Sequence, residues 1–314
     1  MMHGTEETRM VLVTGGAGFI GSHVTDGLVR KGHRVMVLDD LSSGLESNVH
    51  PDARLERLDI CSPEAAELIK DEKPQVLVHH AAQMDVRRST EDPIFDASVN
   101  VLGTLNLLGA AIEAGVKQVI FASTGGAIYG EQDVFPALED HPARPLSPYG
   151  VSKLAGERYL FYFHAQYGLD VTCLRYANVY GERQNPHGEA GVVAIFLTRL
   201  LRGEAPTING DGLQTRDYIH VSDVVQANLA SVGRPGFHTF NVGTGIETTV
   251  VDLYEGLRQA AGSELQAGHG PAKPGEQLRS SIEAAKIRAE LDLPVPIELD
   301  VGLQQTADWF RERS

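Results

Sequence analysis

The feature that most constrains this chain is a short apolar run that leads directly into a cluster of glycines. Val11, Leu12 and Val13 are followed by Thr14-Gly15-Gly16-Ala17-Gly18-Phe19-Ile20-Gly21, and a helical pattern comes next. A strand, a glycine turn and a helix in this order can cradle a phosphate. Glycine permits positive φ and close backbone approach, and the amides at the helix start point at the anion. The same glycines also suit an ordinary tight turn, so the surrounding sequence has to decide.

The end of the next apolar run favours a dinucleotide. Val37 and Leu38 are followed by Asp39 and Asp40, which puts a carboxylate where the hydroxyls of an adenosine ribose are expected. That carboxylate repels a 2′-phosphate, and the segment Leu41-Ser42-Ser43-Gly44 contains no cation that would offset the repulsion. The sequence therefore predicts an NAD site that includes Gly15, Gly18, Gly21, Asp39, Asp40 and Ser42.

Strand and helix patterns alternate through the first half of the chain. Apolar, β-rich runs lie at residues 10–13, 34–38, 75–79, 118–122 and 171–175, and helical spacing covers residues 19–30, 63–71, 94–114 and 148–167. Gly115 and Gly168 stand where helix-ending glycines belong. This alternation predicts an α/β fold with a doubly wound parallel (Rossmann) sheet.

The pattern becomes less regular after Arg175, where glycine, proline and asparagine cluster at 181–191 and 203–212. Residues 218–232 and 239–242 again resemble a helix and a strand that return to the sheet. We therefore expect an NAD-binding domain over residues 9–175 with 218–245, and a smaller, interleaved C-terminal substrate domain over 176–217 and 246–314. Residues 261–275 are the expected long loop.

Composition and charge limit the class of partner. The formal net charge of −15 argues against a nucleic-acid surface, although a few cations can still hold one small anion. Cys61 and Cys173 have no second Cys or His at metal-ligand spacing, so no metal site is expected. The polar amino terminus and the absence of a long uninterrupted apolar run favour a cytoplasmic protein with no membrane partner.

Tyr149 and Lys153 are the strongest candidates for acid–base chemistry. They are four residues apart in the helix that opens at Pro148, so they lie on the same helical face. An adjacent ammonium and a cationic nicotinamide would favour the phenolate of a tyrosine whose pKa is ordinarily near 10. Such a pair is also common as simple packing, and only its combination with the glycine cradle gives it weight.

The combined motifs resemble the extended short-chain dehydrogenase/reductase family, and within it the UDP-glucose 4-epimerases (UDP-galactose 4-epimerases). The resemblance runs from Val11 to about Lys286. Its most specific pieces are residues 14–23, 59–60, 80–83, 123–130, 149–153, 175–181 and 216–223, together with Asn100.

The resemblance implies roles for further residues. Phe19 and Ile20 would lie beside the pyrophosphate, Asp59 and Ile60 beside the adenine, and the cofactor channel would be lined by Ala81, Ala82, Gln83 and Asn100. Lys153 would also bind the nicotinamide ribose. The substrate diphosphate would contact Asn178 and Arg216, and the uridine would be surrounded by Val193, Thr207, Asn209 and Glu276.

The implied reaction is C4 epimerisation of a UDP-hexose through a 4-keto sugar. Tyr149 would take the proton of the 4-hydroxyl while NAD accepts the C4 hydride, and both would return to the opposite face. UDP would anchor the ketone as it turns over.

The chain departs from the family pattern in three places. Gly125 stands where many relatives carry a Ser or Thr that binds the sugar 4-hydroxyl, so Thr124 or a water is expected to replace it, or Tyr149 acts unaided. Gly126 and Ala127 lack the carboxylates that 4,6-dehydratases need. Lys273 replaces an arginine that holds a phosphate in relatives, and Arg279 is the expected substitute for this contact.

Some alternatives stay open at this point. Ser280 lies at a position where relatives restricted to plain hexoses carry a bulky Tyr and relatives that accept N-acetylated sugars carry a small residue. The resemblance therefore implies that UDP-GlcNAc and UDP-GalNAc are accepted. A UDP-glucuronate 4-epimerase of the same family or a non-catalytic NAD-sensing regulator are the other readings. The family also implies a homodimer.

Overall fold

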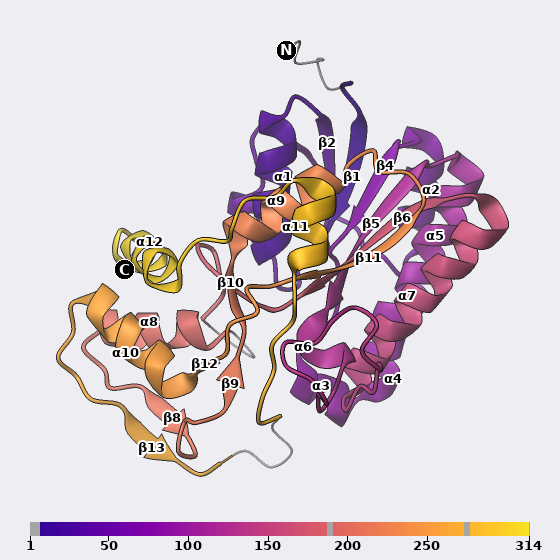
Figure 1. Cartoon of the computed structure of the whole chain (residues 1–314). Coiled ribbons are helices and arrows are strands. Elements are labelled where there is room, and N and C mark those ends of the chain that lie inside the picture. The colour runs from indigo at the N-terminus through magenta and orange to yellow at the C-terminus, as the bar shows by residue number, and fades with distance from the viewer. Residues whose placement is uncertain (1–6, 187–190, 273–276, 314) are drawn as a thin grey trace. The chain divides into compact units, whose positions relative to one another are not determined.

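The computed structural model describes residues 7–186, 191–272 and 277–313 (Figure 1). The chain divides into two compact units. The first contains residues 1–123, 147–174 and 228–239, and the second contains residues 124–146, 175–227 and 240–314. Segment 124–146 thus falls in the second unit, whereas the sequence-based division leaves it in the first.

A seven-stranded sheet forms the centre of the first unit, and it confirms the predicted doubly wound fold. The strand order is β11-β6-β5-β4-β1-β2-β3. The strands are β1 Met10–Thr14, β2 Arg34–Leu38, β3 Arg54–Glu56, β4 Val76–His79, β5 Gln118–Thr124, β6 Asp170–Tyr176 and β11 Phe237–Val242. β1 pairs in parallel with both β2 and β4. The strand order reverses beside β1, and ligands of such sheets bind at this kind of switch point.

Helices cover both faces of this sheet (Figure 1). α1 Phe19–Arg30 lies on one face, and α2 Pro63–Glu72, α5 Thr104–Ala114 and α7 Pro148–Tyr167 lie on the other, where Leu107, Leu108 and Leu160 join the buried core. α7 begins where the Ser147 side chain accepts a hydrogen bond from the amide of Gly150, and it ends at Gly168, which has a φ of 69°. The shorter helices of this unit are α3 Val86–Glu91 and α4 Pro93–Ala97.

The second unit has its own apolar core between helices and short strands. Its helices are α6 Gly125–Ile128, α8 Val192–Leu201, α10 Val250–Ala261, α11 Ala285–Leu291 and α12 Leu299–Arg311, and α9 Val221–Ser231 begins in it. Its short strands are β7 Asn178–Tyr180, β8 Thr207–Asn209, β9 Thr215–Arg216, β10 Tyr218–His220, β12 Thr248–Thr249 and β13 Gly268–Gly270. Phe196, Leu253 and Leu303 pack in the core that α8, α10 and α12 share.

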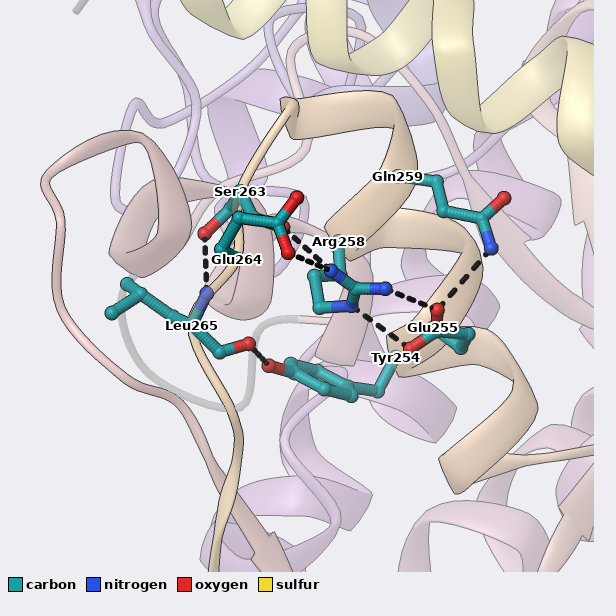
Figure 2. A network of polar contacts seen from close by, with 7 residues as sticks. All are labelled: Tyr254, Glu255, Arg258, Gln259, Ser263, Glu264 and Leu265. Atoms are coloured by element: carbon teal, nitrogen blue, oxygen red, sulfur yellow. Dashed lines mark hydrogen bonds and ion pairs between the residues drawn. The ribbon is translucent and has the colours of Figure 1, made fainter.

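A polar network fixes the chain where it leaves α10 (Figure 2). The Arg258 guanidinium donates to both carboxylate oxygens of Glu255, at 2.9 and 2.6 Å, and to the carbonyl of Ser263 at 2.9 Å. The Tyr254 hydroxyl donates to the carbonyl of Leu265. These bonds join the helix to the segment that leads to β13.

Three predicted elements differ from the structure. Residues 218–220 form strand β10, paired in parallel with β7, and only then does helix α9 begin. All three residues of β10 are buried, and a short apolar run of this kind has no period that separates strand from helix. The expected loop at 261–275 contains β13, which pairs with β8.

The third difference is the predicted helix at 94–114, which consists of α4, a π-helical turn at Ser98–Gly103 and α5. The sequence was expected to contain no apolar run long enough to cross a membrane. By length and composition alone, however, the helix Pro93–Ala114 is long and apolar enough to do so. A core helix of a soluble protein meets the same criteria, and α5 buries its apolar face against α2 and the sheet.

Candidate active site

The glycine turn after β1 is built so tightly that larger side chains do not fit. Gly15 has a φ of 68°, and a Cβ atom on it would lie 2.6 Å from the amide nitrogen of Ala81. A Cβ on Gly21 would lie 2.1 Å from the carbonyl oxygen of Gly15. No side chain caps the start of α1, whose N-cap is Gly18. The first backbone amides of α1 can therefore donate hydrogen bonds to a ligand, as anion binding at a helix N-terminus requires.

Asp39 ends the second strand beside this turn. One carboxylate oxygen accepts a hydrogen bond from the amide of Ala17 and the other accepts from that of Leu41, both at 2.9 Å. Burial raises the pKa of Asp39, and the two amide bonds oppose that rise. The carboxylate is therefore held in one orientation. Asp40 instead accepts hydrogen bonds from the amide and the hydroxyl of Ser42, and both residues are exposed.

The predicted channel residues are joined by hydrogen bonds. The amide of Ala81 donates to the Thr14 hydroxyl at 3.2 Å. The Asn100 side chain accepts from the amide of Gln83 and donates to its carbonyl, at 2.9 and 2.8 Å. Ala82 lies between Ala81 and Gln83 in the segment that follows β4. Asn100 itself lies in the π-helical turn, a feature often found at functional sites.

The predicted adenine contacts lie between β3 and α2. Asp59 is exposed and accepts a hydrogen bond from the amide of Cys61 at 2.8 Å, while Ile60 is buried. Phe19 and Ile20 form the first turn of α1. One unit thus contains a glycine turn with no room for larger side chains, an uncapped helix start, and the Asp39 carboxylate oriented to bind a ribose. These residues fit NAD.

Tyr149 and Lys153 lie on α7 in the same unit. The Lys153 side chain is buried, its Nζ donates to the carbonyl of Ala122 at 3.0 Å, and it lies 6.0 Å from the centre of the Tyr149 ring. Burial lowers the pKa of Lys153 to about 8, against an opposing effect of Asp96. Burial also raises the pKa of Tyr149, and the charge of Asp96 adds to the rise. Lys153 does not by itself lower that pKa, so the expected lowering depends on the nicotinamide charge.

Asp96 was missed by the sequence analysis. It is fully buried, and its carboxylate accepts hydrogen bonds from Ser152, Asn100 and Gln83. The signal that would have found it is the spacing of Asp96 and Asn100, four residues apart in an apolar helical segment and thus on one face. A carboxylate is rarely fully buried unless it is paired, so its hydrogen-bond partners define its place in the fold.

In the second unit, the structure explains why position 125 is a glycine. A Cβ on Gly125 would lie 2.6 Å from Cδ1 of Ile282, which is itself buried. At Gly126, by contrast, the nearest atoms to a Cβ would be Oδ1 of Asn178 at 3.6 Å and the hydroxyl oxygen of Thr124 at 3.9 Å. The side chain that many relatives carry at 125 would therefore require Ile282 to shift, whereas at Gly126 the oxygens of Thr124 and Asn178 lie at ordinary contact distance from the Cβ position.

The two arginines predicted to bind phosphate lie on adjoining segments of this unit. β9, which carries Arg216, pairs with β12, and the amide of Thr215 donates to the carbonyl of Leu278, next to Arg279. The amide of Asn178 donates to the carbonyl of Asp217, next to Arg216. The structure thus brings the three predicted diphosphate contacts to neighbouring positions.

Arg279 already has an anionic partner. Its guanidinium donates to both oxygens of Glu247, at 2.9 and 2.5 Å, and lies 3.9 Å over the ring of Phe135. These hydrogen bonds hold the pKa of Glu247 below its usual value. Arg279 would have to leave or share this pair to bind a phosphate.

The remaining predicted substrate residues are less closely grouped. Val193 is buried at the start of α8, and Thr207 and Asn209 begin and end β8. Glu276 and Lys273 lie outside the described residues. Within the described ranges, no group of three or more His, Cys, Asp or Glu side chains could hold a metal ion.

Comparison with known proteins places the chain in a family. The profile of the NAD dependent epimerase/dehydratase family matches residues 11–243. The chain belongs to this family. A UDP-glucose 4-epimerase from Mycolicibacterium smegmatis is 44% identical to this family member over 96% of the chain and 99% of the relative.

Two solved structures are similar to it throughout. The UDP-glucose 4-epimerase of Thermotoga maritima with UDP-glucose has a TM-score of 0.95 and 45% identity, and covers 97% of this chain and 99% of its own. The Thermus thermophilus UDP-glucose 4-epimerase in complex with NAD has a TM-score of 0.93 and 42% identity, over 97% and 100%. These matches confirm the predicted enzyme class, an isomerase resembling these epimerases, and NAD as the cofactor.

Proposed function

We propose that this chain interconverts UDP-hexoses that differ in configuration at C4, with UDP-glucose and UDP-galactose as the first pair. The observation that carries the proposal is the Tyr149–Lys153 pair on α7, in the same unit as a glycine cradle that fits NAD. The names of the relatives support the same activity.

In the proposed reaction Tyr149 moves the proton of the sugar 4-hydroxyl. NAD, when bound, supplies a hydride acceptor and donor for C4. Lys153, fixed by its bond to Ala122, places a positive charge beside the tyrosine and the nicotinamide ribose. Asp39 and the amides of the first turn of α1 hold the ribose and the pyrophosphate. Tyr149 returns the proton once the ketone has presented its other face.

The substrate is anchored through its diphosphate and uridine. Arg216 and Asn178 bind phosphate oxygens in this proposal, because a guanidinium fork forms paired, charge-assisted bonds to them. Val193, Thr207 and Asn209 surround the uridine, together with Glu276. Thr124, whose hydroxyl lies next to Gly126, binds the sugar 4-hydroxyl in place of the side chain absent at Gly125.

Position 126 and its neighbour favour epimerisation over dehydration. Elimination of water needs a positioned acid and base, and neither Gly126 nor Ala127 supplies one. The small, buried Ser280 supports acceptance of N-acetylated UDP-sugars as well. Loss of all activity on the acetylated substrate, with normal turnover of UDP-galactose, would refute that extension.

We also propose a homodimer in the cytoplasm. Apolar side chains are exposed on neighbouring helices of the first unit, with 79% of Ile94, 61% of Leu102 and 53% of Val151 accessible. Tyr159 and Tyr162 continue the exposed face of α7. Burial of this face against a second copy would remove it from water. A sedimentation velocity experiment would show one species of twice the chain mass.

The test of the activity is direct. The purified protein is incubated separately with UDP-galactose, UDP-N-acetylgalactosamine and UDP-glucuronate, and the C4 epimers are separated by chromatography. The proposal expects epimers from the first two substrates. Turnover of UDP-glucuronate alone would assign the chain to a different substrate, and no epimer from any of the three would contradict the proposal.

A further inference from the structure

A carboxylate that the proposed reaction does not use lies buried beside its two reactive side chains. Asp96, in α4, accepts a hydrogen bond on one oxygen from the Ser152 hydroxyl at 2.6 Å. Its other oxygen accepts from the side-chain amides of Asn100 and Gln83, at 3.0 and 3.1 Å. All three donors are neutral, so the hydrogen bonds satisfy the carboxylate without cancelling its charge.

These bonds connect three parts of the cofactor region. Ser152 stands on α7 between Tyr149 and Lys153, and it is buried. Asn100 lies in the π-helical turn, and Gln83 lies in the segment after β4. Asp96 thus fixes the helix that carries the reactive pair against the residues predicted to line the cofactor channel.

The charge of Asp96 acts on both reactive groups. Burial lowers the pKa of Lys153 to about 8, and Asp96 opposes this. Burial raises the pKa of Tyr149, and Asp96 adds to that rise. The carboxylate therefore favours a protonated lysine next to a tyrosine that keeps its proton until a cation approaches it.

Other titratable groups around the pair act less directly. His79, which ends β4, and His80, which follows it, are uncharged near neutral pH, because burial lowers both pKa values to about 3. Glu157, one turn beyond Lys153, accepts a hydrogen bond from the Ser123 hydroxyl at 2.6 Å.

α3 contributes Arg87, Arg88 and Glu91, and all three are exposed, so that water screens their charges. The part of β5 beside Lys153 contributes Phe121, Ala122 and Ser123, none of which is charged.

We propose that Asp96 is a positioning residue of this site: its buried carboxylate places a negative charge beside the Tyr149–Lys153 pair, and its hydrogen bonds tie α7, through Ser152, to Asn100 and Gln83. The inference rests on the proposed function, since it assigns Asp96 a part in that reaction. Its charge and its hydrogen bonds can be separated by mutation.

Asp96→Asn removes the charge and can keep the bonds. The asparagine oxygen still accepts from Asn100 and Gln83, and its amide donates to Ser152, whose hydroxyl turns to accept. Ser152→Ala is the matched control, because it deletes one hydrogen bond and leaves the charge. Asp96→Glu keeps the charge and alters the bonds.

The first measurement needs no substrate. In protein labelled with ¹³C at the lysine ε-carbon, the Lys153 signal is assigned by its absence in Lys153→Met and titrated by NMR. Asp96→Asn should move its midpoint to lower pH by about one unit, while Ser152→Ala should leave it in place. An unchanged midpoint in Asp96→Asn would overturn the proposal.

The second measurement is the pH dependence of kcat with UDP-galactose. Asp96→Asn should move the whole profile toward acid, because both pKa values fall when the negative charge is removed. A lower kcat at every pH without any shift would mean a merely structural role and would overturn the proposal.

Two further outcomes are defined in advance. If Asp96→Asn does not fold, Asp96→Glu carries the test: a wild-type Lys153 midpoint supports the proposal, and a downward shift despite the retained charge overturns it. If the wild type epimerises no UDP-sugar while the NMR shift is observed, the proposed function fails and the charge effect of Asp96 stands.

Discussion

The proposed cofactor region of the first unit and the proposed substrate region of the second are built in different ways. In the first, backbone groups make the close contacts: Gly15 lies against the amide of Ala81, and Asp39 accepts a hydrogen bond from the amide of Ala17. In the second, side chains make them: Gly125 faces the Ile282 side chain, and Arg279 is held by the carboxylate of Glu247. The contrast suggests that the cofactor region tolerates little change, whereas the substrate region can vary between relatives that act on different sugars.

The largest expected effect is on the rate of the chemical step. Tyr149→Phe removes the only hydroxyl that we assign to proton transfer, and it should lower kcat by about 10²–10⁴-fold with NAD still bound. Tyr159→Phe, on the exposed face of the same helix, should leave kcat unchanged. Turnover of UDP-galactose by the two variants provides the comparison, and equal rates would remove Tyr149 from the mechanism.

The next largest effect is expected when a side chain is added to the glycine turn. Gly21→Ala places a Cβ 2.1 Å from a backbone oxygen and should cost about 3 kcal/mol of stability together with most of the NAD affinity. Gly109→Ala, in α5 with no atom within 4 Å of the new Cβ, should stabilise the protein by about 0.5–1 kcal/mol. Urea unfolding and NAD titration measure both. Tight NAD binding by Gly21→Ala would show that the cradle is not the cofactor site.

A pH effect tests the burial of the histidines behind the cradle. His79 and His80 have pKa values lowered to about 3, from an ordinary value of 6.5. Below pH 6.5 both histidines are protonated in the unfolded chain but stay neutral in the folded chain. The free energy of unfolding therefore decreases as the pH is lowered, by up to about 1.4 kcal/mol per pH unit for each histidine. His80→Asn should reduce the slope of the free energy of unfolding against pH, between pH 6 and 5, by the contribution of one histidine. An unaltered slope would mean that His80 is protonated in the fold.

The comparison can also be sharpened within the second unit. Gly125→Ala should cost about 1–2 kcal/mol because of Ile282, and Ile282→Val, which removes Cδ1, should recover much of that loss in the double variant. Gly126→Ala is the matched control and should change the free energy of unfolding by less than about 0.5 kcal/mol. Equal costs at 125 and 126 would contradict the packing explanation.

The smallest effect is expected at the exposed arginine. Arg279→Lys keeps the charge but loses the fork, and it should raise KM for the UDP-sugar by less than about tenfold without changing kcat. Glu247→Gln frees the guanidinium and should lower KM. If neither variant changes KM, Arg279 takes no part in substrate binding, and the pair with Glu247 is structural.

The sequence could predict the features that local signals specify. α1 and α7 have the predicted bounds because their start and stop signals are local: glycines before Phe19, and Ser147, Pro148 and Gly168 around α7. The cradle and the Tyr149–Lys153 pair were recognisable for the same reason.

The features that escaped prediction depend on contacts between distant segments. Gly125 is explained by Ile282, Asp96 by Ser152, and the partner of Arg279 by the position of Glu247. The π-helical turn at Ser98–Gly103 also gives no periodic signal of its own. No local pattern in the sequence encodes such pairs, although the spacing of Asp96 and Asn100 marks Asp96 itself.

The most direct test of the central claim follows the hydrogen at C4. UDP-galactose carrying deuterium at C4 is incubated with the wild-type protein in ordinary water, and the UDP-glucose formed is examined by mass spectrometry and NMR. Because the proposed chemistry removes this hydrogen as a hydride and returns it to the same carbon, the product should keep its deuterium at C4. Formation of UDP-glucose that has lost the label to water would contradict the account.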